Sequence, residues 1–379
     1  MKKPLFLFGI LALLAGCSTL DAINPFASRG PKMAELQTIK ATATTRIVWR
    51  DSVGKAGLYA FTPAIVGASV YVADKDGTLA RFDDGKQTWK IKTEQPLSAG
   101  VGADLTKVAV GSPKGDLLVF SAADGKLLWK AKATSEILAP PAIGEGLVIV
   151  RSGDNRLAAY GAEDGKRKWI FQRPMPALSL RVTTAPLIDN KHVLAGFPNG
   201  KLIAVNAANG AADWDGTVAV PKGATELDRV ADITSAPALA GRLICAVAFQ
   251  GRVACFDLAN GAIAWSREMS SSVGLTVDQR NLYVTDDKGT VHALDLASGA
   301  SLWKQDKLYL RRVSAPVVSR NFVVVADAQG VLHFLNREDG AFAARQNTDG
   351  SPVVAPLQLQ GSRVIAQTSS GGIFAVEAE

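Results

Sequence analysis

The chain has 379 residues, of which 47% are hydrophobic, and this is ample for a large buried core. Its formal net charge is +7, but the basic residues are scattered along the chain and form no Lys/Arg block. Scattered charge is typical of an ordinary solvated surface, so we expect no nucleic-acid partner.

The first 16 residues have the layout of a secretory signal peptide. Lys2 and Lys3 precede an almost wholly apolar run, residues 5–14. This run is too short for a transmembrane helix, which needs about 20 apolar residues, but it fits the hydrophobic region of a signal peptide. We therefore expect residues 1–16 to be a cleaved signal peptide.

Residues 14–17 read LAGC and resemble the lipobox of bacterial lipoproteins. The resemblance implies cleavage before Cys17 and attachment of acyl chains to that residue, and Ser18, where an aspartate would favour retention at the inner membrane, points to the outer membrane. Several acyl chains on one residue give lasting attachment to a membrane. No repeat is visible in residues 17–44, so we expect a lipidated N-terminus followed by a flexible tether.

A repeat with a period of about 40 residues runs through the rest of the chain. Seven copies of a turn, such as SAADGKLLW at 121–129, place a glycine four residues before the same marker position. A glycine after Asp, Asn or Ser between apolar runs predicts a hairpin turn. The marker position holds tryptophan in most copies, and one further tryptophan precedes the first turn: Trp49, Trp89, Trp129, Trp169, Trp214, Trp265 and Trp303, with Ala344 in the last copy.

Each repeat is expected to form four short strands. Within residues 62–90 we predict strands at 63–66, 69–73 and 78–82, and a fourth that opens at 87–89. Four strands per repeat of this length are typical of a β-propeller blade. A pair of helices would need an amphipathic period of 3.6 residues, and the sequence has none.

The two ends of the chain complete an eighth blade. Seven glycine turns define seven pairs of third and fourth strands, Trp49 lies on an extra fourth strand, and residues 356–376 supply three strands without a fourth. Residues 45–379 are therefore predicted to be an all-β, eight-bladed β-propeller of four-stranded antiparallel blades, whose last blade is closed by N- and C-terminal strands. Closure removes the exposed edges of an open sheet. The recurrent tryptophan is predicted to wedge between adjacent blades.

The sequence contains no recognisable catalytic, metal or cofactor site. His192, His292 and His333 occur singly, without an HExxH motif or paired metal-ligand spacing, so we expect no catalytic residue, no metal and no cofactor. Cys245 and Cys255 lie on the two strands of one predicted hairpin. They form a disulfide if the register places them opposite each other, and otherwise are free, buried thiols.

The repeats resemble those of quinoprotein-like propellers, a group that includes pyrroloquinoline-quinone (PQQ) dehydrogenases and several lipoproteins. The lipobox, the propeller and two segments, PALSLR at 176–181 and ELDRVAD at 226–232, together resemble the outer-membrane assembly factor BamB (YfgL) family over essentially the whole chain. A quinone-dependent dehydrogenase is the enzymatic alternative. The long insertions, vicinal cysteines and calcium-ligating acids of those enzymes are not evident here.

The resemblance implies that Leu178, Leu180, Arg181 and Asp232 occupy partner-binding positions. The second segment also contributes Asp228 and Arg229, and Thr234 stands where the family often has another acidic residue. Both segments lie in unusually long connections between repeats, and loops on a rigid scaffold often carry function. Apolar anchors beside charges are typical of an interface hot spot. The alternative is that the leucines tuck into the propeller and the charges pair with one another.

The BamB resemblance implies a non-catalytic scaffold that is lipid-anchored at the periplasmic face of the outer membrane of a Gram-negative bacterium. Its implied partners are the POTRA region of BamA and, through BamA, the other subunits of the β-barrel assembly machinery. Nascent outer-membrane barrel proteins are further candidate partners, and the sequence leaves open whether they bind directly.

Overall fold

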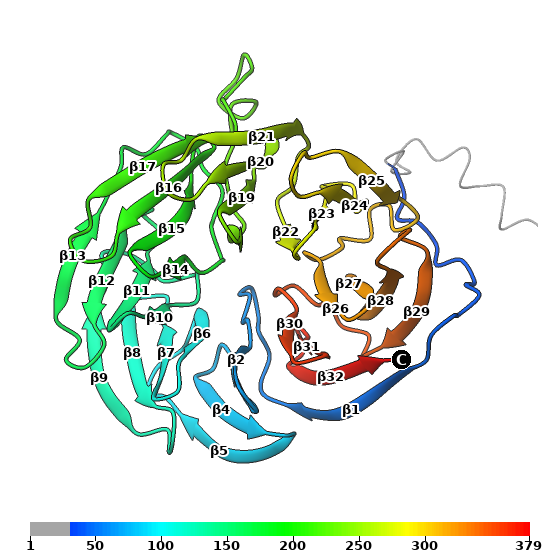
Figure 1. The fold of residues 1–379 in the computed structure, drawn as a ribbon. Coiled ribbons are helices and arrows are strands. Elements are labelled where there is room, and N and C mark those ends of the chain that lie inside the picture. The colour runs from blue at the N-terminus through cyan, green and yellow to red at the C-terminus, as the bar shows by residue number, and fades with distance from the viewer. Residues whose placement is uncertain (1–30) are drawn as a thin grey trace, which may run out of the picture. The chain divides into compact units, whose positions relative to one another are not determined.

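Eight four-stranded antiparallel sheets follow one another around a ring in the computed structural model, which describes residues 31–379 (Figure 1). This confirms the predicted eight-bladed β-propeller. Residues 34–379 form one compact unit. The expected signal peptide, Cys17 and the first part of the expected tether, up to residue 30, lie outside the described residues. No helix within the described part of the chain is long and apolar enough to cross a membrane.

The blades are numbered in chain order, and their strands are given from the innermost to the outermost. Blades 1 to 4 comprise β2 (Ala64–Val66), β3 (Ser69–Ala73), β4 (Thr78–Asp83) and β5 (Lys86–Lys92); β6 (Ala99–Ala103), β7 (Lys107–Gly111), β8 (Asp116–Ser121) and β9 (Leu127–Lys132); β10 (Ala142–Gly144), β11 (Leu147–Arg151), β12 (Leu157–Gly161) and β13 (Arg167–Phe171); β14 (Leu187–Asp189), β15 (His192–Phe197), β16 (Lys201–Asn206) and β17 (Ala212–Thr217).

Blades 5 to 8 follow the same order. They comprise β18 (Ala238–Ala240), β19 (Leu243–Val247), β20 (Arg252–Asp257) and β21 (Ile263–Glu268); β22 (Gly274–Val277), β23 (Asn281–Thr285), β24 (Val291–Asp295) and β25 (Ser301–Gln305); β26 (Val317–Ser319), β27 (Phe322–Ala326), β28 (Val331–Asn336) and β29 (Phe342–Asn347); β30 (Gln358–Gln360), β31 (Arg363–Gln367), β32 (Gly372–Ala378) and β1 (Thr45–Ser52).

Blade 8 is assembled from both ends of the chain, as predicted. β1 pairs antiparallel with β32, with Thr45 opposite Ala378 and Ser52 opposite Gly372. The second and third strands of each blade are buried on both faces, and β3 and β12, for example, are buried throughout. These strands are mostly apolar because the neighbouring blades cover both of their faces.

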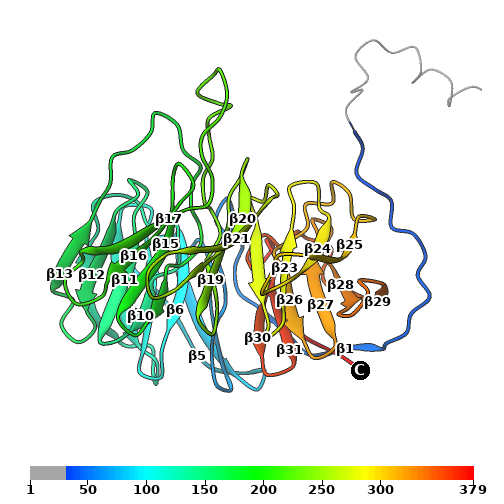
Figure 2. The ribbon, with the colours of Figure 1, turned by 45° about the horizontal axis from the view of Figure 1, so that its top comes forward.

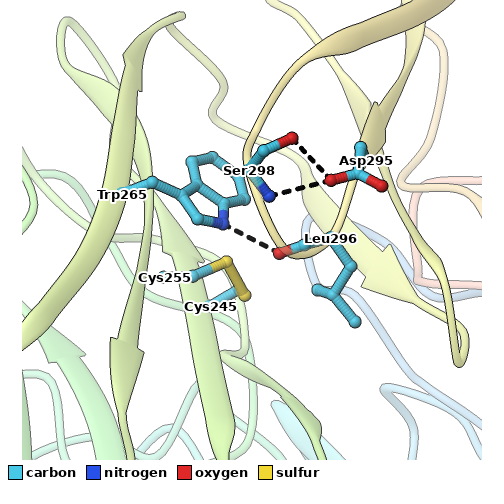
Figure 3. The surroundings of a disulfide bond; sticks show 6 residues. All are labelled: Cys245, Cys255, Trp265, Asp295, Leu296 and Ser298. Atoms are coloured by element: carbon cyan, nitrogen blue, oxygen red, sulfur yellow. Dashed lines mark hydrogen bonds between the residues drawn. A yellow bond between two sulfur atoms is a disulfide. The ribbon is translucent and has the colours of Figure 1, made fainter.

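The repeated tryptophans wedge between neighbouring blades, again as predicted. Trp169 of blade 3 donates a hydrogen bond from Nε1 to the carbonyl oxygen of Ala207 in blade 4 over 2.7 Å. Its ring covers Gly210, where the backbone has φ = 77° and an added Cβ would lie 2.8 Å from ring carbons. Trp265 makes the same contact with Leu296, as Figure 3 shows. Glycine is therefore needed both for the turn and for the close approach of the ring.

Cys245 and Cys255 lie directly opposite each other on β19 and β20, with a Cα–Cα distance of 4.0 Å, and their sulfur atoms are bonded. The disulfide is fully buried, beside the ring of Trp265 (Figure 3). It cross-links β19 and β20, the two central strands of blade 5. Blade 5 follows the longest connection between blades, residues 218–237.

The ring has two distinct faces. The hairpin face carries the turns between first and second strands and between third and fourth strands. These two turns hydrogen bond to each other, and in blade 3 the N–H of Ala162 donates to the carbonyl oxygen of Gly146. The loop face carries the turns between second and third strands together with the connections between blades. The N–H of Leu310, in the connection from blade 6 to blade 7, donates to the carbonyl oxygen of Lys288 in the turn between β23 and β24.

Candidate partner-binding site

The two longest connections between blades, residues 172–186 and 218–237, rise from the loop face (Figure 2). They follow blades 3 and 4, so they are neighbours on the ring. The sequence segments that resemble the BamB family lie in these two loops.

Asp232 joins the two loops. Its Oδ2 accepts the backbone N–H of Leu180 at 2.7 Å, and its Oδ1 accepts the backbone N–H of Asn199 at 3.1 Å. The side chain is only 1% exposed. Asp232 therefore holds the Leu180 loop in place, instead of presenting an exposed charge to a partner. Burial raises the pKa of the Asp232 carboxyl, against the opposing effects of the Leu180 and Asn199 N–H groups and of the Arg151 charge.

Arg151 places a buried guanidinium near the Asp232 carboxylate, and this residue was not predicted from the sequence. It donates to the carbonyl oxygen of Gly196 and to Oδ1 of Asn155, and it lies 4.9 Å from the ring centroid of Phe197. Burial lowers its pKa to about 10, and the charge of Asp232 opposes this shift. One signal was available: Arg151 ends an otherwise apolar strand, β11, and a charged residue in such a strand is rarely buried without partners.

The apolar and basic residues of the first loop remain accessible. Leu178 is 48% exposed, Leu180 is half-buried, and Arg181 is exposed. The sequence had left open whether the leucines tuck into the propeller, and the outcome is divided. Leu180 is partly packed while its N–H is held by Asp232, whereas Leu178 projects into solvent.

The charged side chains of the second loop bond within that loop, and one pair of them forms an ion pair. Oδ2 of Asp228 accepts hydrogen bonds from the N–H and Oγ1 of Thr225, which lowers the pKa of Asp228. Arg229 forms an ion pair with Glu226 at 3.3 Å and donates to the carbonyl oxygen of Gly223. Asp228 and Arg229 therefore shape the loop in this structure, although both remain exposed.

A depression of about 290 Å³ is lined by residues from five of the connections between blades. Leu180 and Arg181 of the first long loop line it, together with Val354 of the connection from blade 7 to blade 8. Thr234 is buried in its wall and donates from Oγ1 to the carbonyl oxygen of Ser272 at 2.9 Å. The position where the family often has an acidic residue thus links two inter-blade connections through a neutral hydrogen bond.

The histidines are each paired with one aspartate. His192 lies 3.3 Å from Asp213, and His292 and His333 lie 3.0 Å from Asp286 and Asp327. In the part of the chain that the structure describes, no group of three or more His, Cys, Asp or Glu side chains is placed to hold a metal ion.

Comparisons with known proteins agree on one family. The sequence model described as outer membrane protein assembly factor BamB matches residues 75–305, and the model of a prokaryotic membrane lipoprotein lipid attachment site matches residues 1–18. BamB of Bordetella pertussis is 41% identical over 380 aligned residues, covering 100% of this chain and 97% of the relative. BamB of Escherichia coli is 34% identical and covers 99% of both chains.

Solved structures of this family and of other propellers match the fold. The crystal structure of BamB from Moraxella catarrhalis matches with a TM-score of 0.82 and 26% identity, covering 88% of this chain and 100% of that one. The quinohemoprotein alcohol dehydrogenase of Comamonas testosteroni matches with a TM-score of 0.69 at 14% identity, covering 88% and 76%, which is a likeness of fold alone. The chain belongs to the family of outer membrane protein assembly factor BamB.

Proposed function

We propose that this chain is a non-catalytic scaffold lipoprotein that assists the assembly of β-barrel proteins into the outer membrane. Membership of the BamB family supports the general role. The match of residues 1–18 to a lipid attachment site supports an anchor on Cys17, with the propeller on the periplasmic side. BamA is the proposed direct partner and connects the propeller to the other Bam subunits. Nascent barrel proteins are proposed as transient partners only.

The arrangement of the two long loops carries the proposal of a BamA site. Leu178 and Arg181 are exposed, Arg181 also lines the depression, and Asp232 fixes the loop that bears them. A loop that is already fixed loses little backbone conformational entropy on binding. Exposed apolar and arginine side chains on such a loop are suited to act as interface hot spots. In this proposal Leu178, Leu180 and Arg181 contact the POTRA region of BamA. Asp228 and Arg229 border the contact. Asp232 does not touch the partner but holds the backbone of Leu180.

Co-purification with the POTRA region of BamA tests this assignment. Leu180→Asp and Arg181→Glu should each reduce capture at least about tenfold, the loss expected when a hot-spot residue worth 1.4 kcal/mol or more is removed. Leu105→Asp is the matched control because Leu105 is 85% exposed and lies on the hairpin face. Wild-type capture by both loop variants would remove the site from Leu180 and Arg181.

The dehydrogenase alternative has a separate readout. A quinone absorbance band in the purified protein, together with dye-linked oxidation of an alcohol, would establish that alternative and overturn the scaffold proposal. We expect neither, because the three cysteines of the chain are at positions 17, 245 and 255 and cannot form a vicinal pair.

A further inference from the structure

Residues 34–44, here called the strap, run along the outside of blade 7. At one end, Thr42 and Ala43 donate their N–H groups to the carbonyl oxygen of Ala343 at 2.9 and 3.2 Å. Thr44 exchanges backbone hydrogen bonds with Glu379, where β1 enters blade 8. This part of the expected flexible tether is therefore hydrogen bonded to the propeller.

Two arginines of the propeller hold the other end of the strap by its backbone. Arg311 donates from Nη1 to the carbonyl oxygen of Ala34 at 2.8 Å, and Arg345 donates from Nη1 to that of Gln37 at 2.6 Å. The N–H of Ala34 is itself bonded to the carbonyl oxygen of Tyr309 at 3.0 Å. Arginine donors directed at carbonyl oxygens fix the path of a peptide independently of its side chains.

Arg311 belongs to a buried network and is not a mobile surface group. Its side chain is 2% exposed and pairs with the fully buried Asp327 at 2.7 Å. Asp327 also accepts from His333, and these partners hold the pKa of the Asp327 carboxyl at about 2 although burial opposes it. A buried guanidinium costs free energy unless its donors are satisfied, and the strap supplies one of the acceptors. Leu36 adds an apolar contact with the core cluster of blades 6 and 7.

The strap crosses from one face of the ring to the other. It leaves β1 at the hairpin face, beside the C-terminal end of β32, and reaches Tyr309 in the connection between blades 6 and 7 on the loop face. Ten extended residue steps span up to roughly 35 Å, enough for this crossing. Figure 2 shows the strap rising from β1 towards the side on which the long loops project.

We propose that the strap sets the side of the ring from which the chain runs back to Cys17, so that the loop face lies nearer the membrane than the hairpin face. The inference rests on the lipid attachment proposed above. An undocked strap would release the chain at Thr45, on the hairpin face. The strap thus brings Ala34, from which the chain continues back towards Cys17, to the face that bears the candidate partner-binding site.

Energy transfer to a membrane measures this orientation. The lipidated full-length chain is reconstituted in phosphatidylethanolamine and phosphatidylglycerol vesicles containing rhodamine-labelled phosphatidylethanolamine as acceptor. A donor dye is attached at Leu227→Cys on the loop face or at Leu105→Cys on the hairpin face, where the native leucines are 70% and 85% exposed. The buried disulfide leaves the introduced thiol as the reactive one. We expect greater transfer from position 227.

Undocking the strap should abolish that difference. Leu36→Asp places a charge where Leu36 packs, and Thr38→Asp is the matched control because the Thr38 side chain is exposed. Trypsin cleavage after the exposed Lys40 reports docking directly, and we expect it to be at least about tenfold faster in Leu36→Asp than in wild type or Thr38→Asp, the effect of losing 1.4 kcal/mol of docking free energy.

The outcomes separate the two proposals. Equal transfer from positions 227 and 105 in the wild type, or equal cleavage of Leu36→Asp and wild type, would overturn the strap inference while leaving the scaffold role intact. A chain that does not float with the vesicles would instead remove the lipid anchor on which the inference rests.

Discussion

Replacing Asp232 by alanine should release the first long loop without changing any residue exposed at the candidate site. The carboxylate accepts two backbone N–H groups, from Leu180 in the first long loop and from Asn199 in the turn between β15 and β16, which lie 52 and 33 residues away in sequence. Each buried N–H that loses its acceptor costs about 1–3 kcal/mol. Burial of the carboxylate is itself unfavourable, as its raised pKa indicates, and alanine removes this cost. That gain offsets part of the loss. We expect the free energy of unfolding to fall by about 2–4 kcal/mol.

Amide hydrogen exchange distinguishes this clamp from general destabilisation. Protection of the Leu180 and Asn199 amides should fall at least about tenfold beyond the global change, equivalent to 1.4 kcal/mol of local opening. Asp232→Asn keeps one acceptor oxygen, so one of the two amides should stay protected. Capture by BamA should weaken in Asp232→Ala although the residue is buried, because Leu180 is no longer held.

Asp228→Ala is the matched control for the clamp. Asp228 lies in the same loop and is exposed, and its hydrogen bonds are made with Thr225 three residues away. Its removal should leave the amide of Leu180 protected. Full protection of Leu180 in Asp232→Ala, or the same loss of protection in Asp228→Ala, would refute the assignment of Asp232 as the residue that positions the loop.

Three further predictions concern stability. Trp169→Ala should lower the free energy of unfolding in urea by about 3–5 kcal/mol, because it removes a buried wedge and its hydrogen bond; a loss below 1 kcal/mol would contradict the wedge. Replacing Cys245 and Cys255 together by alanine should cost roughly 2–3 kcal/mol for their sequence separation of 10, and dithiothreitol should then have no effect on the double variant, unlike on wild type. Burial lowers the pKa of His333 below 6.5 despite Asp327, so the folded state favours the neutral ring. Its stability contribution is present above pH 6.5 and is lost as the pH falls through the lowered pKa, so unfolding free energy should drop more between pH 7.5 and 5.5 in wild type than in His333→Gln.

The architecture was predictable because each blade repeats a local rule. A glycine turn followed four residues later by tryptophan marks the third and fourth strands, and both residues act on their immediate neighbours in space. The split blade also followed from counting the expected strands. Three strands at the C-terminal end lack a fourth, and the extra N-terminal strand completes that blade. The register of Cys245 and Cys255 was left open, because a shift of one residue would place them on opposite faces.

The candidate site was less predictable because its key contacts join residues that are far apart in sequence. The positions of Leu178, Leu180 and Arg181 followed from resemblance, but the burial of Asp232 depends on Asn199 and Arg151, which come from other parts of the ring. An aspartate in a long polar loop gives no local sign of burial. The docking of residues 34–44 was missed for the same reason, because its partners Arg311 and Arg345 lie about 300 residues later in the chain.

The one marker position without tryptophan follows from the way the ring closes. Each tryptophan covers the glycine turn between the third and fourth strands of the next blade, from Trp49 on Gly85 to Trp303 on Gly340. Ala344 belongs to blade 7, and the next blade has no such turn because β32 and β1 are the two ends of the chain. A tryptophan at position 344 would therefore meet no glycine turn. Alanine there leaves room for the strap, whose Ala43 packs in the same core cluster. The missing tryptophan and the strap are thus two consequences of a single closure between β1 and β32.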